Sequence, residues 1–230
     1  MKLTRVVLII MGIFSFKNTF AGSSEDTFWK WFQKNESTIL NFERDQERTF
    51  DKLASKMNVV NEDLTFEFGP ISDDGKREFV ISAGGIKASF PAVEALHSSA
   101  PQMKNWVFTK YRPRRNPLND LSYGGVSVPV GDVHYKMFKD DEKVGIIVFL
   151  KGYSEEQHDI YGNIGYLFLD EALGEYDIET KVGFIEFHNR ESKYYEGALP
   201  LKELAEAFDD YFQHHYQSPT PTIHRRYEHA

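Results

Sequence analysis

The chain of 230 residues contains no cysteine. Disulfide bonds, thiolate nucleophiles, thiolate metal sites and iron–sulfur clusters are therefore excluded, and the folded chain must be stabilised by packing alone. The sequence also lacks a Gly-x-Gly-x-x-Gly or Walker-type loop and a His-Glu-x-x-His pattern. The nearest approach to a serine-nucleophile motif, Gly125–Pro129, lacks the second glycine that such a motif requires. We therefore expect no cofactor and no metal.

The chain has fewer basic than acidic residues. The chain has 27 Lys and Arg residues against 35 Asp and Glu residues, which gives a net charge of −8. An acidic protein is repelled by phosphate backbones and by anionic membrane surfaces, so a nucleic-acid partner is not expected. A protein partner stays open. Aromatic residues make up 15% of the chain and hydrophobic residues 41%, which is enough to build a sizeable core.

The first 21 residues are predicted to be a signal peptide. Lys2 and Arg5 form a positive start, Val6–Phe16 is an apolar run, and Ala21 offers the small residue expected before a cleavage site. As a helix this run would rise only ~16 Å, too little for a bilayer core of ~30 Å. We expect an exported protein, periplasmic or secreted, with no membrane span after cleavage. An uncleaved anchor or a buried N-terminal helix is the alternative.

The remainder is predicted to be a single α+β domain over residues 22–217, followed by a flexible polar tail over 218–230. Apolar stripes at helical spacing and alternating apolar residues mark the elements. Helices are predicted at about 24–42, with a break near Asn35, and at 44–58, 90–99, 158–173 and 201–215. Strands are predicted at about 64–68, 77–83, 106–111, 126–130, 133–139, 143–150 and 180–187.

The order of these elements suggests a duplication. Strand, acidic turn, strand, helix and strand occur over about 63–111 and again over about 133–187. One hypothesis is two ββαβ halves sharing one mixed, largely antiparallel sheet with helices packed on it. The other is a plain α+β domain without duplication. The continuous apolar run 143–150 indicates a central strand buried on both faces.

Several segments resemble a group of uncharacterised bacterial proteins of unknown function. The resemblance covers about residues 25–190 and implies one structural unit, but no activity. It is carried by Phe28–Phe32, Leu64–Gly69, Phe79–Ala83, Ala100-Pro101 with Trp106, and Leu169–Glu186.

Four residues are candidates for catalysis. Glu175 and Asp177, with Glu179, alternate along the chain, so in an extended segment they would project to one side. Paired carboxylates can perform general acid–base chemistry, and His134 or His188 could serve as the base. The alternative is that these acids are solvated charges near a helix end and that the histidines are scattered.

Five residues are candidates for a ligand site or an interface. Arg112, Arg114 and Arg115 form the one basic cluster, and arginine forks can bind a carboxylate or phosphate, or equally pair with internal acids. Trp29 and Trp31 cannot both share the buried stripe of their helix with its phenylalanines. We expect one of the two in a groove or at an interface.

Two functions are consistent with these patterns. The first is a non-enzymatic, exported binding or protein-interaction domain, which is supported by the lack of a catalytic motif and by the spare aromatic residues of the first helix. The second is a hydrolase or metal-assisted enzyme that uses Glu175 and Asp177 with His134 or His188. This second function requires the four side chains to converge in one pocket.

Overall fold

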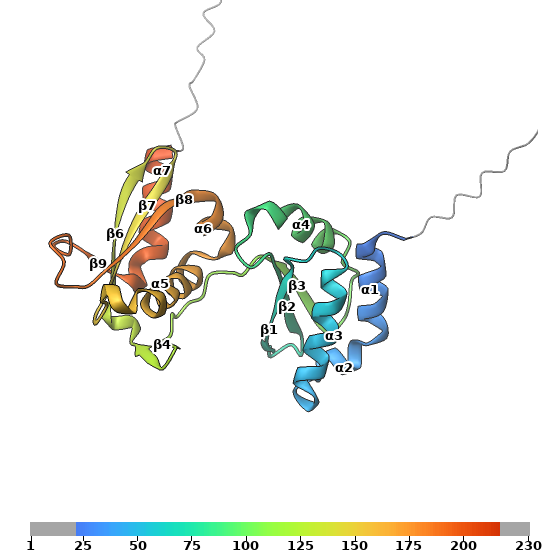
Figure 1. Ribbon diagram of the computed structural model, residues 1–230. Coiled ribbons are helices and arrows are strands. Elements are labelled where there is room, and N and C mark those ends of the chain that lie inside the picture. Colours follow the sequence, from blue (N-terminus) through green and yellow to red (C-terminus); the bar gives the residue numbers. More distant parts are fainter. Residues whose placement is uncertain (1–21, 217–230) are drawn as a thin grey trace, which may run out of the picture.

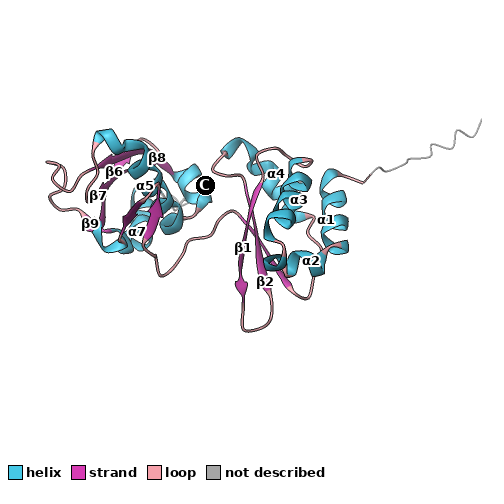
Figure 2. Ribbon diagram, turned by 60° about the horizontal axis from the view of Figure 1, so that its bottom comes forward, coloured by secondary structure: helices cyan, strands magenta, loops and turns pink. Residues whose placement is uncertain are grey.

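The computed structural model of the chain describes residues 22–216. The predicted signal peptide (1–21) and the predicted tail (218–230) lie outside the described residues. The described part is an α+β protein, as predicted, and it forms two lobes that lie side by side in both views (Figures 1 and 2). No helix among residues 22–216 is long and apolar enough to cross a membrane.

The first lobe is a three-stranded sheet covered by helices. Its elements are α1 (Ser24–Lys34), α2 (Glu36–Leu40), α3 (Gln46–Asn58), β1 (Thr65–Ile71), β2 (Arg77–Ser82), α4 (Phe90–Ser98) and β3 (Trp106–Lys110). The strand order is β1-β2-β3, with β1 antiparallel and β3 parallel to β2. The Ser23 hydroxyl caps α1 by accepting from the backbone N–H of Asp26 at 3.1 Å. Asn35 ends that helix, as the sequence predicted.

Aromatic rings fill the core of this lobe. Phe28 and Phe32 from α1 pack around Phe79 of β2, and Phe32 and Phe79 are fully buried. Leu53 and Met57 of α3 join the same cluster. The periodicity of both helices therefore predicted the buried faces correctly.

The second lobe is a four-stranded sheet with helices on one face. Its elements are β4 (Leu121–Tyr123), β5 (Val126–Val128), β6 (Val133–Asp140), β7 (Lys143–Leu150), α5 (His158–Leu173), α6 (Glu175–Lys181), β8 (Val182–His188), β9 (Leu199–Pro200) and α7 (Leu204–Tyr216). The strand order is β8-β7-β6-β9, and β4 and β5 form a separate hairpin. Residues 144–150 of β7 are all buried, which confirms this strand as a central one.

The two lobes repeat one arrangement. In β1-β2-α4-β3 and in β6-β7-α5-β8, an antiparallel hairpin is followed by a helical crossover to a parallel strand. The hypothesis of two ββαβ halves is therefore confirmed in its topology. A sheet shared by the halves is wrong, because each lobe has its own sheet and its own hydrophobic cluster. The chain turns away from the first sheet at Tyr111, whose φ is 63°, and reaches the second lobe as a linker.

The acids before the last predicted strand are helical. The strand predicted over 180–187 begins at Val182, and Glu175–Lys181 form α6. Gly174, with a φ of 75°, ends α5 and allows this second helix to start at once. The backbone N–H of Ile178 then donates to the carbonyl of Gly174 at 3.2 Å. Glu175 and Asp177 are therefore not in an extended segment, so the alternation does not project them to one side of a strand.

Candidate ligand pocket and the predicted site residues

Glu175 lies at the junction of the two lobes and is only 1% exposed. Its Oε1 accepts backbone N–H groups of Ala83 at 2.9 Å and Gly85 at 3.1 Å. Its Oε2 accepts the backbone N–H of Arg112 at 3.1 Å. All three donors belong to the first lobe or the linker, whereas Glu175 belongs to the second. The carboxylate therefore fastens one lobe to the other.

Arg112 strengthens the same junction. Its guanidinium donates to both carboxylate oxygens of Asp170, at 2.6 and 3.0 Å, and to the hydroxyl of Ser82 at 2.9 Å. Burial lowers the pKa of this arginine, but the hydrogen bonds and charge of Asp170 outweigh it, so the pKa is raised overall. The arginine is thus firmly charged and occupied by internal partners.

The other two arginines of the cluster also pair with acids of the chain. Arg114 donates to Asp177 at 2.5 Å and to Asp209 at 2.7 Å, and these bonds, led by that to Asp209, raise its pKa against the effect of burial. Arg115, which is more exposed, donates to Glu67 at 3.0 Å. The candidate carboxylate Asp177 is therefore paired with Arg114 and with Lys181, and each of the three arginines has an acidic partner within the chain.

The two candidate histidines lie in one row of the second sheet. His134 and His188 are the neighbours of Phe149 on either side of β7. His188 Nε2 lies 3.0 Å from a carboxylate oxygen of Glu186. Burial, helped by the charge of Arg190, lowers the pKa of His134, so its ring favours the neutral form.

The structure does not bring these histidines to the candidate carboxylates. Glu175 and Asp177 precede β8, whereas His188 is its last residue. Seven extended residues span roughly 20 Å. In the part of the chain that the structure describes, no three His, Asp or Glu side chains gather to hold a metal ion. The convergence that a carboxylate–histidine site requires is absent among these four residues.

The two tryptophans of α1 have different surroundings, as the sequence predicted. Trp29 is only 3% exposed, and its indole N–H donates to the carbonyl of Leu96 at 2.8 Å. Its candidacy as a ligand residue is therefore wrong, because it is a core residue. Trp31 is half-buried and lines a pocket of about 220 Å³.

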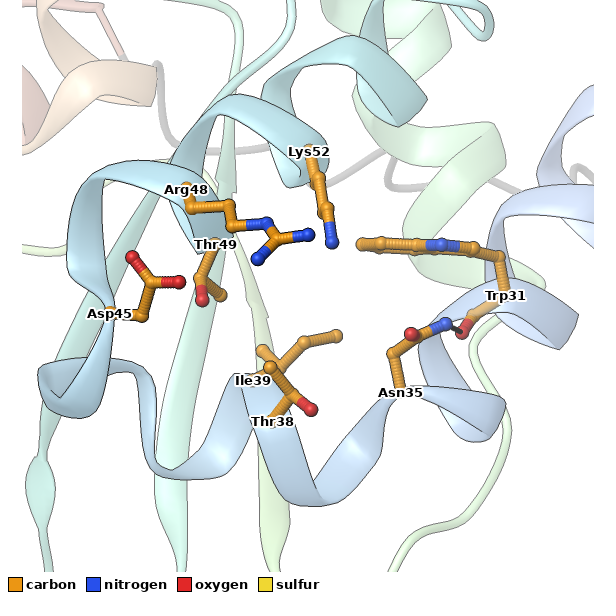
Figure 3. Close-up of a pocket in the computed structure, with 8 residues that line it drawn as sticks. All are labelled: Trp31, Asn35, Thr38, Ile39, Asp45, Arg48, Thr49 and Lys52. Atoms are coloured by element: carbon orange, nitrogen blue, oxygen red, sulfur yellow. Dashed lines mark hydrogen bonds between the residues drawn. The ribbon is translucent and has the colours of Figure 1, made fainter.

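We call this hollow the Trp31 pocket (Figure 3). It lies between α1, α2 and α3, and Arg48 and Lys52 of α3 point across it toward the Trp31 ring. Asn35 is held below the ring, because its amide donates to the Trp31 carbonyl at 2.7 Å. The remaining lining residues are Thr38, Ile39, Asp45 and Thr49.

The charges of this pocket are not balanced internally. Arg48 and Lys52 stand four residues apart on α3, and like charges at this spacing destabilise a helix by roughly 0.2–0.5 kcal/mol. Neither forms an ion pair within 4.0 Å with any residue in the range 22–216. Asp45 is the one acid in the lining. The pocket thus presents two cations beside an aromatic face.

Sequence reasoning identified Trp31 but missed Arg48 and Lys52. The signal in the sequence was their spacing of four on the helix that carries Phe50 and Leu53. That spacing places both cations on one face, but it cannot tell which helix this face meets.

No protein-family model, no curated protein and no solved structure matches the chain.

Proposed function

We propose that the chain is an exported, non-enzymatic binding domain whose Trp31 pocket holds a small anion. The observation that supports this most directly is the convergence of Arg48 and Lys52 on the half-buried ring of Trp31. An arginine fork binds a carboxylate or phosphate through two parallel hydrogen bonds, and a lysine adds a point charge. The anion can belong to a free small molecule or to an acidic side chain of a protein partner.

The pocket also limits the size and shape of its ligand. A volume of about 220 Å³ is below that of a site for a drug-sized molecule. The indole face favours a flat or apolar group next to the charge. A carboxylate or phosphate attached to a small ring fits these conditions.

We expect wild-type protein to bind benzoate or inorganic phosphate saturably, with a change in tryptophan fluorescence. The double variant Arg48→Gln, Lys52→Gln should weaken this binding by about tenfold or more, because two charge-assisted hydrogen bonds are lost. Trp31→Phe should remove the fluorescence change, since Trp29 and Trp106 are buried in the core. Titration by fluorescence and by calorimetry measures both effects.

Lys56→Gln is the matched control for this experiment. Lys56 is an exposed cation one turn further along α3, and it does not line the pocket. Its replacement should leave binding unchanged. Failure of wild type to bind either probe at millimolar concentration would contradict the proposal, and so would equal loss in the control.

Export is supported by the charge and hydropathy pattern of residues 1–21. When the full chain is expressed in a bacterium, we expect the protein outside the cytoplasm with its N-terminus at Gly22. Cell fractionation and mass spectrometry of the intact protein measure this. An uncleaved chain found only in the cytoplasm would rule the export proposal out.

A further inference from the structure

A second pocket lies in the other lobe, beside the linker. It has a volume of about 640 Å³, and we call it the linker pocket. Residues Arg114–Leu118 form one wall, the end of α5 forms a second, and the turn that precedes α7 forms a third. Its size falls within the range of roughly 300–1,000 Å³ that is usual for small-molecule sites.

Much of its lining is apolar. Leu201 and Ala172 are almost fully buried, and Leu118 and Val130 are half-buried beside them. These side chains belong to or pack against the core of the second lobe. An apolar chain that entered the pocket would lie against the exposed parts of Leu118 and Val130, which the buried Leu201 and Ala172 support from below, and binding would remove this apolar area from water.

The rim carries cations with free donors. Lys202 is exposed and forms no ion pair with any other described residue. The side chain of Arg115 is 53% exposed. Its Nη2 donates to Glu67 and its Nε lies 3.9 Å from a carboxylate oxygen of Glu171, so the N–H groups of Nη1 can still donate. Arg114, by contrast, is fully engaged with Asp177 and Asp209. Glu206 is the one acid in the lining.

We propose that the linker pocket binds an amphiphilic monoanion, namely a carboxylate that carries an apolar chain. Lys202 and Arg115 hold the carboxylate at the rim, and the chain lies over Leu118 and Val130, whose side chains are partly exposed. A single negative charge fits best, because Glu206 offsets part of the positive charge of the rim. This site is in a different lobe from the Trp31 pocket and does not depend on the function proposed for it.

Octanoate is the probe for calorimetric titration of residues 22–230. We expect saturable binding that tightens about fourfold for each CH₂ group added from butanoate to octanoate. Acetate, which has the charge without the chain, should bind at least ~10-fold more weakly. The neutral chain 1-octanol should also bind more weakly than octanoate, because it gains no ion pair.

Two variants and two controls complete the test. Lys202→Gln should weaken octanoate about tenfold and leave 1-octanol unchanged, because only the charge is removed. Ala205→Phe, which places a ring in the pocket, should abolish binding of both. Lys104→Gln, an exposed cation outside both pockets, and the Arg48→Gln, Lys52→Gln variant should bind octanoate as wild type does. The proposal is overturned if wild type does not bind octanoate, if 1-octanol or acetate binds as tightly, or if Lys202→Gln has no effect.

Discussion

Replacing Glu175 by alanine is expected to lower the free energy of unfolding by about 4 kcal/mol. The carboxylate accepts three backbone N–H groups, from Ala83, Gly85 and Arg112, and its removal leaves these donors without a partner at a buried junction. It also removes the negative charge next to the guanidinium of Arg112. Unpaired buried donors are among the few causes of so large an effect.

Chemical denaturation of wild type and variants measures this change. Glu175→Gln should lose about half as much, because the amide oxygen can still accept from Ala83 and Gly85 while its NH₂ group faces the N–H of Arg112. Glu179→Gln is the matched control, since Glu179 lies one turn further along α6 and forms no ion pair in the described range. Burial raises the pKa of Glu179, so its neutral replacement should cost little. A loss below about 1 kcal/mol for Glu175→Ala would contradict the assigned role.

Gly165→Ala is expected to destabilise the protein by about 2 kcal/mol, although alanine is the better helix former. Gly165 lies in α5 where the helix meets β8, and a Cβ atom there would overlap the ring of Phe187. Phe187 is only 7% exposed, so the ring has little room to move away. The overlap must be relieved by shifting the helix or by an unfavourable ring rotamer.

Gly162→Ala provides the comparison for this prediction. Gly162 lies one turn earlier on α5, and a Cβ atom there would meet its nearest neighbours, in His158 and Phe187, at 3.8 Å. This substitution should therefore stabilise the protein by up to ~1 kcal/mol, because it gains helix propensity without overlap. The two melting temperatures should move in opposite directions. If Gly165→Ala is as stable as wild type, the Phe187 ring does not lie close enough to α5 to exclude a Cβ atom at position 165.

Much of the fold could be predicted because its long elements carry strong periodicity. The buried stripe of α5 and the unbroken apolar run of β7 each indicate one element type and one buried face. The order of elements also predicted the repeated ββαβ topology. It could not show that the halves form separate sheets, because strand pairing across lobes leaves no local pattern in the sequence.

The helix α6 was missed for a different reason. In Glu175–Lys181, polar and apolar residues alternate, which imitates a strand. The helix forms because its first turn is held from outside: the N–H of Glu175 donates to the Arg112 carbonyl at 3.0 Å. Such a contact, made 63 positions away in the sequence, overrides local pattern. The sequence allowed the arginine cluster to pair with internal acids, but separations of 58 and 63 residues left open that these acids are Asp170 and Asp177.

The candidate site residues could also be predicted only in part. That one tryptophan of α1 must leave the core followed from helix geometry, and Trp31 does so. Which charges surround it depends on how α3 lies against α1, and neither helix encodes that alone. The prediction that residues 22–217 form one domain stays a prediction, and a single transition in the denaturation of wild type would support it.

Each lobe is made from one unbroken stretch of chain, since the first core uses residues between Phe28 and Tyr111 and the second uses residues after them. During synthesis, therefore, the first lobe has all of its core residues before any strand of the second lobe exists. The N–H groups of Ala83 and Gly85 therefore have no protein acceptor until Glu175 is synthesised, 92 and 90 residues later in the chain. The junction cannot be completed before Glu175 has been synthesised, and until then water must satisfy those donors.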